Sequence, residues 1–167
     1  MAMMRLIFDS DGLIKLNRAG VLGRVIQSFV CLVPQSVYDE VVIEGKARRY
    51  PDAEVIEVAL DGGAEVVPHA GRREPNLGLG AGEISILSLL PQMPEAIIIS
   101  DDRRFLTILS AEQVPFLTPV DLLVVMAKQG FLTEDEAREA LERLRPSIRT
   151  KAYLEAQTDL DLEGGVS

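Results

Sequence analysis

The sequence contains one cysteine (Cys31), one histidine (His69) and no tryptophan. A single cysteine cannot form a disulfide within the chain or build a thiolate metal site. A single histidine excludes sites that need two imidazoles, such as the HExxH zinc motif. No apolar run approaches the ~20 residues of a membrane-spanning helix, and the N-terminal segment lacks the apolar core of a signal peptide. We therefore expect a cytoplasmic protein without disulfides.

Positive charge is also scarce, because 17 lysine and arginine residues stand against 26 acids, which gives a net charge of −9. This balance excludes a broad basic surface of the kind that clamps nucleic acid. A protein of this charge would handle nucleic acid through a bound cation or through local basic groups. The sequence has three such groups, which are equally well explained as solvated surface charge: Lys46/Arg48/Arg49, Arg72/Arg73 and Arg103/Arg104.

The length of 167 residues and the 47% hydrophobic content are typical of one globular domain. Short apolar segments alternate with helical patterns along the chain, which predicts an α/β domain with a mostly parallel sheet. We expect this domain to span residues 1–145 and to be followed by a polar C-terminal tail at 146–167. The expected strands are 5–9, 30–33, 64–67, 96–100 and 114–117.

Helical patterns fill the segments between these strands. The pattern at 12–27 is interrupted around Gly20, and the helix that Pro34 opens is expected to end at Gly45. Thr133 and Glu136 form a capping box that predicts a further helix to Arg145. The remaining expected helices are 52–60, 83–90, 101–110 and 119–129, and a loop rich in glycine and proline is expected at 68–82.

Two of the expected strands end in acids. Asp9 follows the first strand, with Asp11 beside it, and Asp101 and Asp102 follow the run Ile97-Ile98-Ile99-Ser100. Each acid could simply cap the next helix. Two such ends on neighbouring strands instead favour a cation site, because clustered carboxylates repel unless a cation compensates them. With so little histidine and cysteine, the expected metal is oxygen-loving magnesium or manganese.

Two further acids have unusual neighbours. Glu40 lies beside the apolar face of its expected helix, and Glu83 opens a helix directly after the glycine-rich segment. Taken singly, Glu40 can be a partly exposed helical residue, and Glu83 can complement the helix dipole. Neither acid by itself establishes a site.

Four segments together resemble a PIN domain: FDSDGLIKL, VPQSVYDEVV, LGLGAGEISILSLL and IIISDDRRFLTIL, in that order. The similarity is to the subgroup with an LGxGE segment and a strand that ends in DD, and it covers roughly four-fifths of the chain. It implies a three-layer α/β/α fold around about five strands. It also implies a Mg²⁺- or Mn²⁺-dependent ribonuclease. The resemblance extends to VapC-type toxins, which implies an antitoxin partner and a homodimer.

The resemblance assigns roles to particular acids. The catalytic, metal-binding quartet falls on Asp9, Glu40, Glu83 and Asp101, with Asp102 as an alternative ligand. Glu83 stands where many members have aspartate. Such acids would hold the metal that activates water for phosphodiester hydrolysis. Arg103 and Arg104 follow closely enough to contact the RNA backbone, and the secondary candidates are Ser10, Asp11 and Asp121.

Two other functions compete with this interpretation. The FDSDG segment also resembles the first motif of haloacid-dehalogenase-type phosphatases, in which Asp9 would be the nucleophile and Asp11 the acid/base. That reaction needs a serine or threonine at the end of an intervening strand and a lysine ahead of the last motif. The only lysine between Lys15 and Lys128 is Lys46, which lies 55 residues before Asp101 in an expected polar loop. It also leaves Glu40 and Glu83 unused. The second alternative is a non-catalytic PIN-like module that binds RNA or protein.

Overall fold

The computed structural model describes residues 3–68 and 78–164 of the chain. Most of the expected loop at 68–82, with His69, Arg72 and Arg73, lies outside the described residues. Among the described helices, none combines the length and the apolar character that crossing a bilayer requires.

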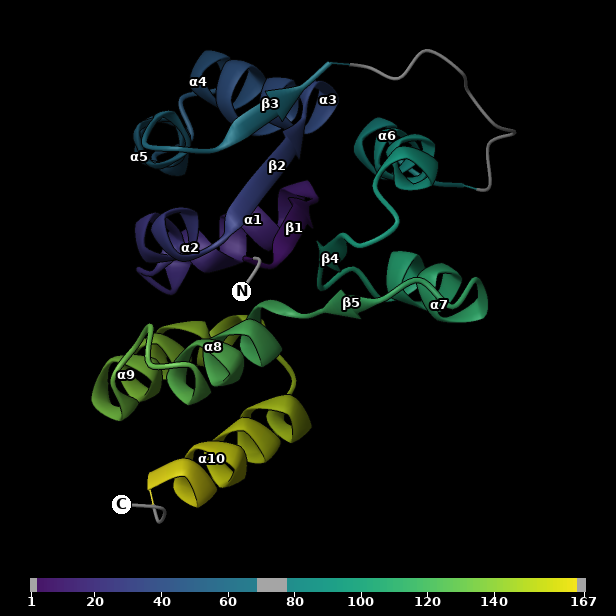
Figure 1. Cartoon of the computed structure of the whole chain (residues 1–167). Helices are drawn as coiled ribbons and strands as arrows, with labels where there is room; N and C mark the ends of the chain where they lie inside the picture. Colours follow the sequence, from purple (N-terminus) through teal and green to yellow (C-terminus); the bar gives the residue numbers. More distant parts are fainter. Residues whose placement is uncertain (1–2, 69–77, 165–167) are drawn as a thin grey trace.

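Five strands form one sheet, and every neighbouring pair runs parallel. The order across the sheet is β3-β2-β1-β4-β5, so β1 is the central strand (Figure 1). These findings confirm the α/β class and the five-stranded parallel sheet. The strands are β1 (Arg5–Phe8), β2 (Val30–Pro34), β3 (Glu65–Val67), β4 (Ile97–Ile99) and β5 (Phe116–Leu117).

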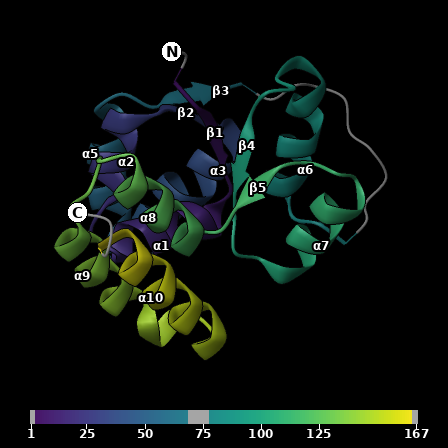
Figure 2. The same ribbon diagram turned by 60° about the horizontal axis from the view of Figure 1, so that its bottom comes forward.

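Helices cover both faces of the sheet. In β1, Leu6 and Phe8 join the larger hydrophobic core and Ile7 joins the smaller one, because successive side chains point to opposite faces. Figure 2 shows α6 and α7 on one side of the sheet and α1, α2 and α8 on the other. The expected three-layer arrangement is therefore confirmed. The helices of these two layers are α1 (Ser10–Arg18), α2 (Leu22–Ser28), α5 (Asp52–Asp61), α6 (Ala81–Leu89), α7 (Arg103–Ala111) and α8 (Pro119–Lys128).

The helical segment after β2 differs from the expectation. It runs as α3 (Gln35–Tyr38), the π-helix η1 (Asp39–Glu44) and α4 (Gly45–Ala47), so Gly45 does not end it. A side chain at Gly45 would place its Cβ 3.0 Å from the Cβ of Ala53 in α5. The glycine therefore serves the close packing of two helical segments, and the chain turns later, at Arg49, where φ is +60°.

The C-terminal segment also differs from the expectation. Instead of forming a polar tail, the chain continues through η3 (Arg145–Ser147) into helix α10 (Thr150–Gly164), beside α8 and α9 (Glu134–Leu144) (Figure 1). Tyr153, Ala156 and Leu160 are 5% exposed or less and belong to the larger core. Their spacing of three and four residues gives α10 one apolar face, which its polar average composition concealed.

The strand order places a crevice at the centre of the sheet. From β1 the chain builds outward through β2 and β3, and it then returns to the other side of β1 to form β4 and β5. In open parallel sheets, sites form outside the carboxyl ends of the strands at this point of reversal. Here those ends belong to β1 and β4, which Asp9 and Ser100 follow directly.

Candidate functional site

Asp9 is held at the end of β1 by two hydrogen bonds. The Gly12 amide donates to Asp9 Oδ1 at 2.7 Å, and the Ser100 hydroxyl donates to Oδ2. The first bond caps helix α1, as the capping alternative anticipates. The second bond joins the ends of β1 and β4, so the carboxylate of Asp9, which is 4% exposed, has a fixed orientation.

Gly12 allows this arrangement because α1 begins against β4. A Cβ at this position would lie 2.5 Å from the carbonyl oxygen of Ile99 and 3.2 Å from Asp9 Oδ1. No real side chain tolerates the first distance. The glycine of the DSDG segment is therefore required by the close approach of the helix to the neighbouring strand.

Asp9 opens into a cavity of about 280 Å³ at the carboxyl ends of the central strands. Acids from four separate segments line this acidic cavity, which is where the sequence predicted a cation. They come from the junction of β1 and α1, from η1, from the start of α6 and from the segment after β4. The lining acids are Asp9, Asp11, Glu40, Glu83 and Asp102.

The two glutamates reach the acidic cavity from opposite helices. Glu40 Oε2 accepts a hydrogen bond of 2.7 Å from Ser10 Oγ, which ties η1 to the start of α1. Glu83 lies in the first turn of α6, where its Oε2 accepts from the Gly80 amide at 3.4 Å. Gly82 lets α6 approach α3, because a Cβ there would lie 2.8 Å from Val37 Cγ2.

The electrostatics of the acidic cavity disfavour negative charge. Burial raises the pKa of Asp9 to about 7, the hydrogen bonds from Ser100 and Gly12 oppose this shift, and the charges of Asp11 and Glu83 add to it. The pKa of Glu83 is also raised, first by burial and then by neighbouring carboxylates. Protonation relieves such repulsion, and so does a bound cation.

The charged form of Asp11 is disfavoured in the same way. Its pKa is raised by burial, and the nearby ammonium of Lys15 lowers it only in part. Its Oδ2 is buried and has no hydrogen-bond partner among the described residues; it lies 3.6 Å from Lys15 Nζ. A buried carboxylate oxygen without a donor is available to a ligand that brings positive charge.

The structure separates Asp101 from Asp102. Asp102 lines the acidic cavity, and its Oδ1 also accepts from the Phe105 amide at 3.0 Å as the cap of α7. Asp101 lines a neighbouring cavity instead and pairs with Lys15 at 2.5 Å. The structure thus brings Asp102, the alternative of the sequence interpretation, to Asp9, Glu40 and Glu83.

An oxygen-only donor set fits a hard divalent cation such as Mg²⁺ or Mn²⁺. Within residues 3–68 and 78–164, no three acidic, histidine or cysteine side chains are already drawn together closely enough to hold a metal ion. The carboxylates thus surround a common space without contacting one another, as mutually repelling groups do. The chemistry of the donors fits the cation, and binding would require the side chains to move inward.

Arg103 and Arg104, which follow β4, are both exposed, but they lie in different surroundings. The Arg104 guanidinium packs directly against Gly78, at the end of the glycine-rich segment. Arg103 instead lines the cavity that contains Asp101. Asp121 is engaged in the capping box of α8, where its Oδ2 accepts from the Thr118 amide at 3.1 Å.

Sequence reasoning missed Ser100 and Lys15. Ser100 is fully buried at the end of an apolar strand, and a signal was present because it directly precedes the two acids. Lys15 lies one helical turn after Asp11, a spacing that places the two side chains on one face. Ser100 supplies a strand-end hydroxyl, but it ends the strand of the last acidic motif and not an intervening strand, as the phosphatase requires. Lys46 pairs with Glu57 at 3.0 Å and does not line the acidic cavity.

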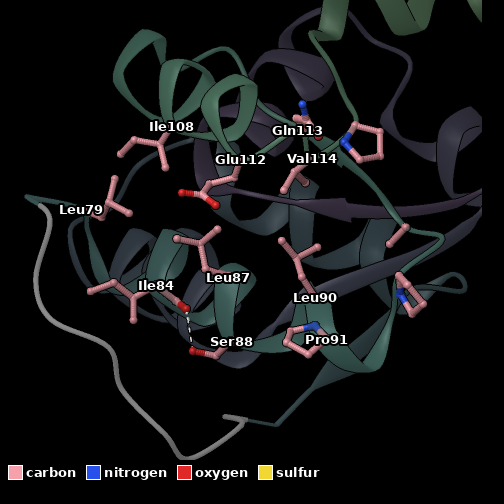
Figure 3. Close-up of a pocket in the computed structure, with 13 residues that line it drawn as sticks. Leu79, Ile84, Leu87, Ser88, Leu90, Pro91, Ile108, Glu112, Gln113 and Val114 are labelled. Atoms are coloured by element: carbon pink, nitrogen blue, oxygen red, sulfur yellow. Dashed lines mark hydrogen bonds between the residues drawn. The ribbon is translucent and has the colours of Figure 1, made fainter.

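A third cavity, of about 640 Å³, has an apolar lining (Figure 3). It lies between α6 and the end of α7, where Leu79, Ile84 and Leu87 face Ile108 and Glu112. The apolar face of α8 at 120–126 is largely buried in the core of its own chain. Ile84 and Leu87, the large apolar residues of α6 that stay partly accessible, line this third cavity.

Comparisons with known proteins agree with this geometry. The family model DUF3368, which describes a PIN domain, matches residues 5–158. The comparison with curated proteins yields no significant match. Among solved structures, the fold is similar to that of a PilT N-terminus domain protein from the hyperthermophilic archaeon Sulfolobus solfataricus P2. That similarity has a TM-score of 0.53 at 16% identity and covers 73% of this chain and 92% of the other. With its acidic cavity at the reversal point of the sheet and a family match over most of its length, the chain belongs to the PIN domain family.

Proposed function

We propose that this PIN domain is a metal-dependent endoribonuclease. The observation that carries the proposal is the acidic cavity, in which four separate segments present carboxylates at the ends of the two central strands. Burial and mutual repulsion raise the pKa of Asp9 to about 7. Buried carboxylates that repel one another are stabilised in their charged form by a bound cation, so the site is suited to a cation.

In this proposal Asp9, Glu40, Glu83 and Asp102 hold Mg²⁺ or Mn²⁺. Bound metal would supply a water of lowered pKa and stabilise negative charge on the phosphoryl group. The protein fixes the ligands: Ser100 and Gly12 orient Asp9, and Ser10 orients Glu40. Asp101, an expected ligand, instead supports the site through its ion pair with Lys15.

A cleavage assay with purified protein tests the proposal. Single-stranded RNA should be cut in Mg²⁺ or Mn²⁺, and EDTA should stop the reaction. Asp9→Asn should reduce the rate ~100-fold or more, because the variant loses a ligand and with it several kcal/mol of transition-state stabilisation. Glu95→Gln is the matched control, since Glu95 is an exposed acid that does not line the acidic cavity.

Two outcomes would refute the ribonuclease proposal. Cleavage that persists in EDTA would remove the metal from the reaction. Hydrolysis of a phosphomonoester with RNA left intact would instead support the phosphatase alternative, which uses Asp9 and Asp11.

We extend the proposal to the biological setting that the family resemblance implies, the toxin of a toxin–antitoxin pair that acts as a homodimer. An antitoxin could place an arginine or lysine among the carboxylates and so occupy the position of the metal. Coexpression with the product of the adjacent gene should then yield a complex with suppressed RNA cleavage. Light scattering of the isolated protein should give twice the chain mass of 18.3 kDa. A monomeric mass would contradict the homodimer. An unchanged cleavage rate after coexpression would contradict the antitoxin partner.

A further inference from the structure

A second polar cavity, of about 490 Å³, adjoins the acidic cavity. Residues that are adjacent in the sequence line the two cavities: Asp102 lines the acidic cavity, and Asp101 and Arg103 line this one. Its walls come from the starts of α7 and α8, from Lys15 on α1, and from the segment that leads into α10. Its volume lies within the range of about 300–1,000 Å³ that is typical of ligand pockets.

This cavity, here called the basic groove, gathers positive charge on an acidic protein. Four cations line it: Lys15, Arg103, Arg149 and Lys151. Three acids also line it: Asp101, Asp121 and Glu155. They offset three of these four charges, so the lining as a whole carries a single excess positive charge. Asp101 pairs with Lys15, and Asp121 caps α8 through the Thr118 amide.

The remaining charges favour an anion. Lys151 lies 3.9 Å from Glu155, but with 87% and 65% of their side chains exposed this pair contributes little. Arg103 and Arg149 are exposed and form no ion pair with any residue that the structure describes. Two guanidinium groups are therefore available in the groove, on a chain whose net charge is −9.

Backbone dipoles and hydroxyl groups add to this preference. Helices α7, α8 and α10 begin at Arg103, Pro119 and Thr150, so three positive helix ends lie at the groove. Thr118 and Ser147 contribute hydroxyl groups to its lining. Guanidinium, ammonium and hydroxyl donors beside helix starts are the groups that bind phosphate oxygens in nucleic-acid complexes.

We propose that the basic groove binds backbone phosphates of single-stranded RNA that flank the position of cleavage. This inference rests on the proposed function, because it takes the strand to run from the acidic cavity into the groove. It assigns a role in substrate binding to the start of α10, through Lys151 and through Arg149, which directly precedes the helix. Leu106 and Ile148 give the groove apolar walls against which a ribose or base can lie.

Binding is measured separately from cleavage to test the groove. The probe is a fluorescently labelled, 2′-O-methylated single-stranded oligoribonucleotide, which cannot be hydrolysed through its 2′-hydroxyl groups, and EDTA keeps the protein from cutting it. Its anisotropy is followed with the full-length wild type and with Arg149→Ala/Lys151→Ala at several salt concentrations. The plot of log K against log salt has a negative slope, and each lost phosphate contact should reduce its steepness by about 0.7. The slope of the double variant should therefore be less steep by about 1.4, and its binding at low salt should be ~10-fold or more weaker.

Arg5→Ala/Lys128→Ala is the charge-matched control. Arg5 begins β1 and Lys128 ends α8, so both lie at the ends of their elements opposite to the groove, and both are exposed. This control removes the same two positive charges and should leave the slope within about 0.3 of the wild type. Thermal unfolding of all variants checks that the exposed substitutions preserve the fold.

The outcomes separate the groove from the ribonuclease activity. Equal affinity and slope in the groove variant and the wild type would overturn the groove proposal, even if the protein cleaves RNA. An equal loss in the control pair would also overturn it, because general charge would then explain binding. Groove-dependent binding without metal-dependent cleavage would uphold the groove and refute the ribonuclease proposal. A wild type that does not bind the oligonucleotide would refute the groove.

Discussion

The hydroxyl of Ser100 donates a hydrogen bond to the carboxylate of Asp9 across the ends of β4 and β1. The same oxygen accepts from the Asp102 amide at 3.2 Å, so one buried side chain connects two acids of the site. This bond lowers the pKa of Asp9, although burial has the larger, opposite effect. The protonation of Asp9 therefore links the stability of the site to pH and to metal.

The metal-free protein should lose stability as pH rises from about 4 to about 7. The pKa of Asp9 is 3.8 in its ordinary state and about 7 in the fold, so between these values the folded state binds more protons than the unfolded state. The free energy of unfolding should then fall by up to ~1.4 kcal/mol per pH unit from this group. Urea unfolding in EDTA at pH 5 and pH 8 measures the difference.

Asp9→Asn is the control for this pH dependence. The amide carries no charge at either pH, so the variant should show a markedly smaller fall between pH 5 and pH 8. A wild-type protein that is more stable at pH 8 than at pH 5 in EDTA would contradict the assignment of a raised pKa to Asp9.

Divalent metal should stabilise the protein more at pH 8 than at pH 6. A metal ion must displace the proton from Asp9, and above a pKa of about 7 that proton has already left. Adding Mn²⁺ or Mg²⁺ should therefore raise the melting temperature by mass action, with the larger increase at pH 8. Differential scanning fluorimetry measures both shifts. A melting temperature that is independent of metal at both pH values would argue against a cation site.

Asp102→Asn should reduce RNA cleavage far more than Asp101→Asn. Asp102 lines the acidic cavity, whereas Asp101 pairs with Lys15 in the basic groove. Asparagine at position 102 can still cap α7 through its side-chain oxygen, so the fold is retained. We expect a loss of ~100-fold for Asp102→Asn and of less than ~10-fold for Asp101→Asn. Cleavage rates in Mn²⁺ decide between them, and the reverse order would make Asp101 the ligand.

The sequence predicted the sheet well because its signals are local. Apolar runs such as Ile97-Ile98-Ile99 and the break at Gly20, where φ is +78°, need no knowledge of the rest of the chain. The choice between Asp101 and Asp102 was different in kind. It depends on Lys15, 86 residues earlier in the sequence, whose ammonium binds one carboxylate and not the other. Adjacent residues carry no local signal of such a contact.

Helix α10 escaped prediction for a related reason. Its buried residues are few and are separated by acids, so its average polarity resembles that of a solvated tail. Only the exposed apolar faces that α8 and α9 would otherwise present show that a further helix is needed. The role of Gly12 was likewise hidden, because the carbonyl oxygen it must approach belongs to a strand 87 residues away.

Gly12→Ala should destabilise the protein and misplace Asp9. The added Cβ would lie 2.5 Å from the Ile99 carbonyl oxygen, so α1 would have to shift away from β4 and weaken the hydrogen bond that orients Asp9. We expect a loss of ~2 kcal/mol or more in the free energy of unfolding. Gly23→Ala is the control, because its Cβ would meet no atom within 4 Å inside α2. That variant should be neutral or more stable by up to ~1 kcal/mol. Denaturant unfolding of both variants provides the measurement, and equal effects would contradict the close approach.

Leu160→Ala should show that α10 is part of the folded core. Leu160 is fully buried in the larger core, whereas Leu162, two residues later on the same helix, is 66% exposed. Removing the buried side chain should lower the free energy of unfolding by ~2–5 kcal/mol, because it leaves a cavity against α8 and α9. Leu162→Ala should change it by less than ~0.5 kcal/mol. Urea unfolding of the full chain measures both. If the two variants were equally stable, α10 would be a detachable tail, and Arg149 and Lys151 would lose the support that holds them beside the acidic cavity.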